Sequence, residues 1–482
     1  SYLYVFPAIF IYFLVLFGVF PLTTQIHIGQ VCSDLNEDDC DSSSVSVKAS
    51  NINLYAGLAQ SISAILVCGF YGSVADIYGR KITIIMPLLG LLAYTSAYLY
   101  VDTSNPSNYF AIILVANVLA GLSGGYFTFI MGVLCYTSDA TMLMPHTRRS
   151  VYSYAEATIT TPQVFGPVLT GIWASYYGFF LPLLLGVILT GVAIVYVTIL
   201  PESLPPDAHS RTQPLALNPL QTFSNFAFLF SHKTLLQAAK SDLHSPISNT
   251  SALDRSKEED ELKEHSTAAA GWSPVPFISL AFLLYFTAVI GQVAVTIVYA
   301  THRFGWDSDV IGIYDGMYGA VVALSMVCAP TVVQAVTCRA KPAKLITWIQ
   351  VGLLFRAIHW CLFGLVKDTV GIFVLLPLLF FVGPLAPYTR TIMSNSVAAS
   401  EQAKIFSAFS ALEGICSLLS PLYSAAYSLF VQADMPGMVF ETMAVASVVA
   451  LCIATYVRMT PSLAQHLPED HGEEGQEAEE SA

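Results

Sequence analysis

The chain has 482 residues, of which 55% are hydrophobic and only 11% are charged, and its formal net charge is -13. A soluble domain carries roughly a quarter charged residues to cover its surface, so a deficit this large excludes an ordinary water-soluble globular protein. The acidic balance, without a basic stripe, also argues against a nucleic-acid partner. Most of the chain is therefore expected to lie in a lipid bilayer.

Twelve apolar windows are long enough to cross a bilayer as helices, which takes about 20 mainly apolar residues each. They lie near residues 2–22, 53–74, 82–101, 109–135, 150–175 and 178–200, and near residues 275–299, 310–337, 344–366, 372–395, 404–430 and 436–458. This pattern predicts an all-α integral membrane protein with 12 transmembrane helices in two pseudo-symmetric six-helix bundles.

The windows divide the chain into four segments. We predict an N-terminal bundle over residues 1–202, a cytoplasmic linker over 203–272, a C-terminal bundle over 273–459 and an acidic cytoplasmic tail over 460–482. The linker is rich in Ser, Lys, Asp and Glu, which is typical of a flexible tether. Within it, residues 217–230 could instead form an interfacial amphipathic segment, and residues 256–265 a short charged helix.

The positions of lysine and arginine predict an orientation, because basic residues are retained on the cytoplasmic side of a membrane. If the first helix starts inside, 15 basic residues fall in the inner segments and three, Lys48, Arg303 and Lys367, fall in the outer ones. Both termini are therefore expected to be cytoplasmic, in the plasma membrane or in a vacuolar or lysosomal membrane.

The loop between the second and third windows has a distinctive spacing, Gly72-Ser-Val-Ala-Asp76-Ile-Tyr-Gly79-Arg80-Lys81. The glycines permit a tight turn, and Asp76 can accept charge-assisted hydrogen bonds from an arginine or a helix N-terminus. Such a latch can form in one conformation and break in another, and Arg148 is a further candidate for it. The loop resembles the signature loop of the major facilitator superfamily, which implies that fold.

Two further elements agree with this resemblance. Residues 201–203, Pro-Glu-Ser, resemble the superfamily's PE[ST] signature at the end of the sixth helix. Gly166-Pro167 followed by Gly171 in the fifth helix resembles the GPxxxG element noted most often in exporters. The alternative interpretation of GPxxxG is a kinked, closely packed helix.

Four short motifs form a narrower pattern. They are Pro21-Leu-Thr-Thr-Gln25, Asp139 with Arg148 and Glu156, Trp306-Asp307-Ser308 before Ile311-Gly312, and Glu401-Gln402 before Phe406-Ser407-Ala408. Together they resemble the proton-coupled folate transporter family (solute carrier family 46). This resemblance implies that Glu156 takes part in proton coupling and that Arg390 handles substrate and protons.

The chain also departs from that family. Ala288 occupies the position of a helix-seven histidine of the folate transporter, although Gln292 can be aligned with it as well. Gly305 stands where the folate transporter has a cysteine, and Glu413 stands where it has an asparagine. These differences argue against folate itself as the substrate.

A few ionisable side chains fall inside the windows, mainly Glu156, Arg356, Arg390 and Glu413. A charge near the bilayer centre costs about 2.5–3.5 kcal/mol on insertion scales, so such residues face a cavity or a partner, and we expect one shared wet cavity. The two glutamates are candidate proton-coupling acids, the alternatives being a structural salt bridge or a place in the vestibule. Arg390 is a candidate anion-binding group, the alternative being a charge that reaches the interface.

Other side chains carry weaker signals. Arg356 and His359 share one face of the ninth helix and, with Gln292, could bind substrate or pair with neighbouring helices. The aromatic residues Phe10, Tyr12 and Phe13 are expected to contact lipid.

Nine cysteines are scattered along the chain without CxxC spacing, so no metal site is expected. Only Cys32 and Cys40, which flank an acidic segment, could form a disulfide, provided that their loop faces an oxidising compartment. The sequence has neither a Walker-type motif nor HExxH, so it predicts no ATP-driven pump, no enzyme and no cofactor.

The sequence therefore predicts a secondary active transporter of a small organic solute, with organic anions among the candidates, coupled to proton symport by alternating access. The expected partners are substrate, protons and lipid, and the expected state is a monomer. Two alternatives are a proton-exchanging exporter of the same fold and a non-transporting membrane sensor or scaffold.

Overall fold

The structure is a computed structural model that describes residues 2–37, 40–140, 145–203, 274–337, 345–395 and 402–460. Within these ranges every regular element is a helix. The segments at 217–230 and 256–265, for which the sequence offers helices, and the acidic tail from residue 461 onward lie outside the described residues.

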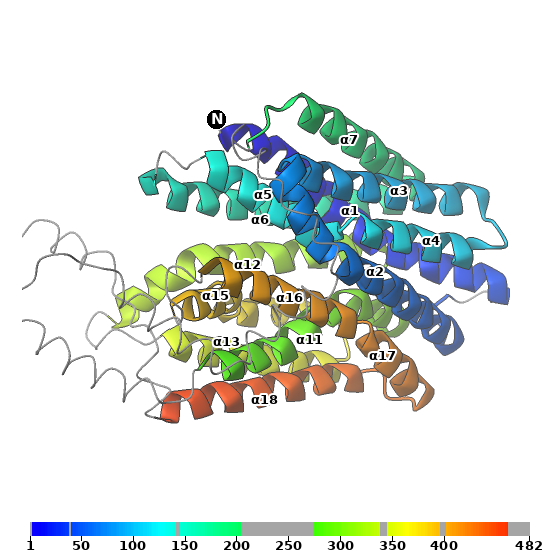
Figure 1. Ribbon diagram of the computed structural model, residues 1–482. Coiled ribbons are helices and arrows are strands. Elements are labelled where there is room, and N and C mark those ends of the chain that lie inside the picture. Colours follow the sequence, from blue (N-terminus) through cyan, green and yellow to red (C-terminus); the bar gives the residue numbers. More distant parts are fainter. Residues whose placement is uncertain are drawn as a thin grey trace, which may run out of the picture.

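The helices before residue 203 form one group, the N-terminal bundle (Figure 1). Its elements are η1 (Tyr2–Val5), α1 (Phe6–Leu35), α2 (Ser43–Tyr78), α3 (Ile82–Ser104), α4 (Tyr109–Leu122), α5 (Gly125–Ala140), α6 (Pro145–Tyr177) and α7 (Phe180–Ile199). Helix α7 lies at its outer edge and packs on α3 and α1.

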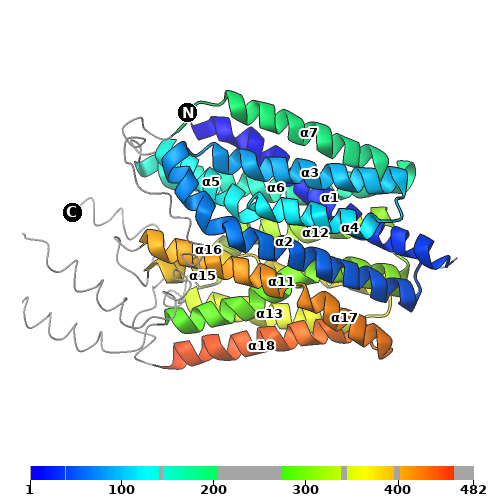
Figure 2. The ribbon, with the colours of Figure 1, turned by 45° about the vertical axis from the view of Figure 1, so that its right-hand side comes forward.

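The helices after residue 274 form a second group, the C-terminal bundle. Its elements are α11 (Val275–Phe304), α12 (Ser308–Thr337), α13 (Leu345–Leu365), α14 (Thr369–Val374), η3 (Leu376–Phe381), α15 (Leu385–Asn395), α16 (Gln402–Leu419), α17 (Leu422–Gln432) and α18 (Met438–Met459). Helix α18 lies at its outer edge, far from α7, in both views (Figure 2). The bundles pack on each other chiefly through α6 against α12 and through α2 against α16 and α17.

The predicted membrane architecture is confirmed. Nine helical stretches among the described residues are long and apolar enough to cross a bilayer. Helices α2, α6 and α12 contain 36, 33 and 30 residues, and at about 1.5 Å per residue each is longer than the roughly 30 Å hydrocarbon core. The count of twelve spans stays a prediction.

The first helix is longer than predicted. Helix α1 continues through Pro21 to Leu35 instead of ending near residue 22. Its second half contains polar residues, but Thr23 and His27 are buried, and Thr23 donates to the Phe20 carbonyl oxygen at 2.8 Å. Hydropathy ends the span too early here because polar side chains that are buried and hydrogen-bonded can continue a helix.

His27 links three helices of the N-terminal bundle. Its Nδ1 lies 2.6 Å from Oδ1 of Asn53 on α2, and its Nε2 lies 2.8 Å from the Tyr98 hydroxyl on α3. Because both ring nitrogens have partners inside the bundle, we assign this cluster a structural role.

The lipid-facing prediction for the first aromatic residues was wrong for two of the three. Phe10 is 37% exposed, but Tyr12 and Phe13 are buried. Tyr12 stacks on Phe129 of α5 with a centroid distance of 3.8 Å. An apolar helix gives no polar face from which its inner side can be recognised, so the orientation of these rings depends on the neighbouring helices.

Small polar residues join the bundles on the side where a loop connects α1 to α2. The Ser46 and Tyr427 hydroxyls lie 3.1 Å apart, and Ser50 donates to the Ser424 carbonyl oxygen at 2.7 Å. Helices α2 and α17 lie side by side there in both views (Figures 1 and 2). Contacts between the bundles therefore close this side of the molecule.

Glycines allow the close approach of α6 and α12 on the same side. A Cβ on Gly312 would lie 3.0 Å from the Gly171 Cα and would overlap the Pro167 carbonyl oxygen. Gly166 lies on a different face of α6 from Gly171 and packs within the N-terminal bundle. A Cβ on Gly166 would lie 3.2 Å from the Gly18 nitrogen. The GPxxxG element thus supplies close packing on two faces of α6, which accounts for its residues without reference to the direction of transport.

We expect the substitution Gly312→Ala to destabilise the protein by about 1–3 kcal/mol, because overpacking against backbone forces neighbouring atoms to move. The measurement is the thermal unfolding midpoint of the purified protein in detergent. Gly191→Ala in α7 is the matched control, since a Cβ there meets nothing within 4 Å and alanine favours a helix. Equal midpoints for the two variants would contradict the proposed tight contact.

Candidate functional site

An ion pair lies inside the C-terminal bundle. Nη2 of Arg390 on α15 donates to Oε1 of Glu413 on α16 at 2.6 Å. The arginine side chain is 38% exposed and the glutamate side chain 9%. The guanidinium carbon also lies 5.5 Å from the Phe409 ring centroid. The structure thus brings together two of the residues that the sequence singles out.

A second arginine occupies a closed environment. Arg356 on α13 is fully buried, and its Nη2 donates to Oε1 of Gln292 at 2.6 Å and to the Tyr318 hydroxyl at 3.2 Å. Its guanidinium carbon lies 4.3 Å from the Trp360 ring centroid, a cation–π contact. Trp360 donates to the same Gln292 oxygen at 2.6 Å.

The expectation of one wet cavity is therefore wrong for Arg356 in this conformation. Its exposed fraction is 0%, whereas Arg390 is partly exposed. His359, one turn from Arg356, is also fully buried, and within the described part of the chain neither ring nitrogen has a hydrogen-bond partner. Sequence spacing identifies charged residues in a span, but it does not tell a paired, enclosed charge from one that reaches water.

Asp315 of α12 is a candidate that the sequence reasoning missed. It is the one charged residue between positions 310 and 337, and the same signal that identified Arg356 could have found it. Its side chain is partly buried, and no hydrogen bond or ion pair joins it to the described residues. At about 100° per residue it projects away from exposed Ile313 and Met317, so it faces the protein interior rather than lipid.

Several predicted residues have backbones in the structure, but their side chains are not among those described. Glu156 and Arg148 lie on α6, and Gly72 and Asp76 lie on α2. Their roles as coupling acid and latch stay predictions.

The described part of the signature loop contacts the end of the sixth predicted span. The backbone nitrogens of Arg80 and Lys81 donate to the Glu202 carboxylate at 2.8 and 3.3 Å. Lys81 Nζ donates to the Thr198 and Leu200 carbonyl oxygens at 2.7 and 2.6 Å. A carboxylate thus lies at the N-terminus of α3 and an ammonium at the C-terminus of α7, as the helix dipoles favour.

Gly79 makes this arrangement possible. Its φ of 110° is one that side-chain-bearing residues rarely adopt, and a Cβ there would overlap the Glu202 carboxylate. The contacts join α3 to α7 within the N-terminal bundle. Glu202 is therefore a further residue of the loop's contact network, and its place in the Pro-Glu-Ser signature was the available signal.

Three other features bear on chemistry. Cys32 and Cys40 are joined by a disulfide with a Cα–Cα distance of 5.3 Å. No cluster of three or more His, Cys, Asp or Glu residues that could hold a metal occurs in the described ranges. Ser123, in a stretch with GxSxG spacing, donates to the Ala120 carbonyl oxygen at 2.6 Å and so bonds to helix backbone.

Comparison with known proteins decides the family. The model of the Major Facilitator Superfamily matches residues 5–421. The chain belongs to this superfamily. It is accordingly a multi-pass membrane transporter of small solutes and not an enzyme.

Solved transporter structures share this fold. The human organic anion transporter MFSD10 (TETRAN) is 16% identical with a TM-score of 0.59, and the alignment covers 94% of this chain and 98% of that one. The POT family transporter PepTSo is 12% identical with a TM-score of 0.67, covering 96% and 98%. The nucleoside transporter NupG is 12% identical with a TM-score of 0.60, covering 94% and 99%. At these identities the likeness establishes the fold alone.

We expect Gln292→Leu to destabilise the protein by about 1.5–3 kcal/mol, the range for a hydrogen bond to a charged group, because Arg356 and Trp360 lose their shared acceptor. Gln292→Glu is the matched variant, since it keeps an acceptor and adds a counter-charge. Thermal unfolding midpoints in detergent compare the two. A leucine variant as stable as the parent would show that Arg356 does not depend on Gln292.

Proposed function

We propose that this transporter carries a small organic anion together with protons by alternating access. The observation that carries the proposal is the Arg390–Glu413 pair, a partly exposed guanidinium bound to a nearly enclosed carboxylate within the C-terminal bundle. Arginine suits this role because its planar fork binds carboxylates and its charge is permanent.

The pair offers a direct route to coupling. An arriving anion competes with Glu413 for Arg390, and a carboxylate that loses its cation in a low-dielectric site binds a proton more readily. Anion and proton therefore favour each other's binding. Glu156, on α6 in the opposite bundle, is the proposed first acceptor of the proton, and Glu413 is the second acid.

Arg356, Gln292 and His359 form the proposed inner part of the substrate site. They are enclosed in this conformation, so a solute would reach them only after helices of the C-terminal bundle shift. The contacts between α2 and α17 and between α6 and α12 support a state closed on the side of the Cys32–Cys40 disulfide. Alternating access requires these contacts to break in the opposite state.

The narrower assignment rests on sequence motifs. The resemblance to the proton-coupled folate transporter family suggests proton symport, and the departures at Ala288 and Gly305 favour an anion other than folate. The proposed membrane is the plasma membrane or a vacuolar or lysosomal membrane, with both termini cytoplasmic and a monomeric chain. The structural neighbour MFSD10 is itself an organic anion transporter.

The two alternatives are separable by experiment. Proton gradients of each sign, imposed on vesicles, distinguish a symporter from a proton-exchanging exporter by the direction of solute movement that each gradient drives. Deletion of residues 203–272 distinguishes a carrier, which keeps its flux when its two halves are expressed together, from a scaffold that signals through this segment.

We expect Arg390→Gln to lower the uptake of organic anions into proteoliposomes by about tenfold or more, because a charge-assisted contact worth about 1.5–3 kcal/mol is lost. Arg390→Lys should retain more of the uptake, since it keeps the charge. Arg458→Gln is the control, an arginine at the end of α18 that donates to Gln350 at 2.8 Å. Uptake by Arg390→Gln equal to that of the control would remove Arg390 from the substrate site.

We expect Glu156→Gln to abolish the pH dependence of uptake while leaving expression intact, because an amide cannot take up the coupling proton. Glu413→Gln should flatten the same profile. The measurement is the initial uptake rate across acidic to neutral pH, with Glu441→Gln of α18 as a carboxylate control. Unaltered pH dependence in both Glu156→Gln and Glu413→Gln would refute the coupling assignment.

A further inference from the structure

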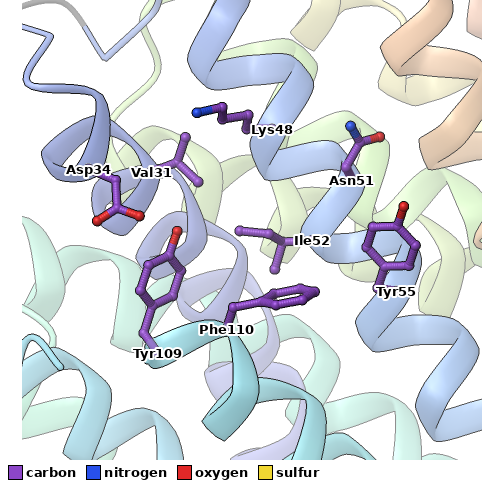
Figure 3. A pocket seen from close by; sticks show the side chains of 8 residues that line it. All are labelled: Val31, Asp34, Lys48, Asn51, Ile52, Tyr55, Tyr109 and Phe110. Carbon is purple, nitrogen blue, oxygen red and sulfur yellow. The ribbon is translucent and has the colours of Figure 1, made fainter. Parts of the chain in front are cut away.

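A pocket of about 230 Å³ opens at the ends of α1, α2 and α4, on the closed side of the molecule. Figure 3 shows the Lys48 ammonium at the top of the pocket, the Asp34 carboxylate on its left, the ring of Tyr55 on its right and the ring of Phe110 below. The Tyr109 hydroxyl points toward Asp34. The pocket therefore has a charged end and an aromatic end.

The aromatic end continues into a lipid-facing stripe. Lys48, Tyr55 and Ile62 recur every seven residues on α2, so they share one face of the helix, and Leu66 follows one turn later. Tyr55, Ile62 and Leu66 are 52%, 49% and 55% exposed. Exposed apolar side chains on the outside of a membrane-spanning helix lie against acyl chains.

The contacts on the opposite face of α2 confirm that the Lys48 stripe faces lipid. Ser46 and Ser50 bond to residues of α17, and a Cβ on Gly57 would lie 2.8 Å from Pro421. At about 100° per residue these positions lie roughly half a turn away from the Lys48 stripe. The stripe therefore faces away from the C-terminal bundle and from the proposed transport site, and only the inner edge of the pocket reaches α17, where Asn51 accepts a hydrogen bond from Ser428 at 2.9 Å.

We propose that this pocket binds the headgroup of a zwitterionic phospholipid from the leaflet on the side of the Cys32–Cys40 disulfide. The phosphate lies at Lys48, the amine lies between Asp34 and the aromatic rings, and an acyl chain runs along Tyr55, Ile62 and Leu66.

Charge complementarity selects this class of lipid. Lys48 is exposed, its charge acts on the nearby Glu37 carboxylate, and its ammonium at the rim can meet a phosphate while its stem covers apolar surface. Asp34 is exposed at the other side of the rim. An ammonium group there gains both the carboxylate and the faces of the aromatic rings.

A neighbouring carboxylate disfavours headgroups with a net negative charge. Glu37 lies just beyond α1 and accepts hydrogen bonds from the Ser42 and Ser44 hydroxyls, which lower the pKa of its carboxyl. The two carboxylates and one lysine that the structure describes near the rim match a headgroup that carries an amine as well as a phosphate. A phosphate without an amine would meet more negative than positive charge.

The test uses the purified full-length protein in detergent, titrated with phosphatidylethanolamine, phosphatidylcholine or phosphatidylglycerol. The readouts are the thermal unfolding midpoint and the lipid retained in native mass spectrometry. We expect the two zwitterionic lipids to bind more tightly than phosphatidylglycerol. Lys48→Gln should weaken their apparent Kd about fivefold, the equivalent of about 1 kcal/mol per basic residue.

Two variants and a soluble probe complete the experiment. Lys367→Gln, an exposed lysine just after α13 on the same side, should bind lipid as the parent does. Asp34→Asn should reduce the preference for zwitterionic over anionic lipid. The proposal is overturned if Lys48→Gln and Lys367→Gln behave alike, if Asp34→Asn leaves the preference unchanged, or if soluble glycerophosphoethanolamine stabilises the protein as well as the lipid does.

Discussion

The constraint on which this structure depends is that a charge inside a membrane needs a partner. The two central arginines of the C-terminal bundle meet it in different ways. Arg356 is enclosed by the neutral amide of Gln292, a tyrosine hydroxyl and the Trp360 ring, so among the described residues its charge is stabilised by dipoles and π faces. Arg390 is partly exposed and has an ionised partner, Glu413.

An enclosed charge with neutral partners stabilises one arrangement of helices, whereas a partly exposed ion pair can exchange one anion for another. This difference makes Arg390 the better candidate for a group that binds and releases a solute.

The same constraint separates contacts within a bundle from contacts between bundles. Within the N-terminal bundle, Glu202 and Lys81 place charges at the ends of α3 and α7, which strengthens the bundle as a unit. Between the bundles, the described contacts are hydroxyl hydrogen bonds such as that of Ser50 and glycine contacts such as that of Gly312. A neutral hydrogen bond contributes only about 0.5–1.5 kcal/mol. Charged contacts at helix ends inside the N-terminal bundle, and hydroxyl and glycine contacts between the bundles, favour rigid-body rocking over rearrangement of single helices.

Hydropathy predicted the fold well because lipid imposes a length and a composition on every span. Hydropathy failed where tertiary contacts determine the length of a helix or the direction in which a side chain points. The polar second half of α1 stays helical because His27 and its neighbours find partners inside the bundle, and Tyr12 turns inward because Phe129 lies there. For the site, the sequence identified Arg390 and Glu413 but not their pairing, and it could not tell that Arg356 is shut away from water. A complete count of the charged residues within the predicted spans would have identified Asp315.

On the proposed mechanism, in which Glu156 accepts the proton first, charge balance at the Arg390–Glu413 pair favours binding of anion and proton together. Counted by itself, the pair of one guanidinium and one carboxylate is neutral when no solute is bound. With an anion on Arg390 and a proton on Glu413 the site is neutral again. An anion bound without a proton leaves one net negative charge, and a proton bound without an anion leaves one net positive charge. Each half-loaded state costs about 2.5–3.5 kcal/mol in the membrane interior, which lowers its population roughly a hundredfold. The bundles therefore reorient mainly when the site is empty or fully loaded, and solute and proton cross together without a separate gate for either.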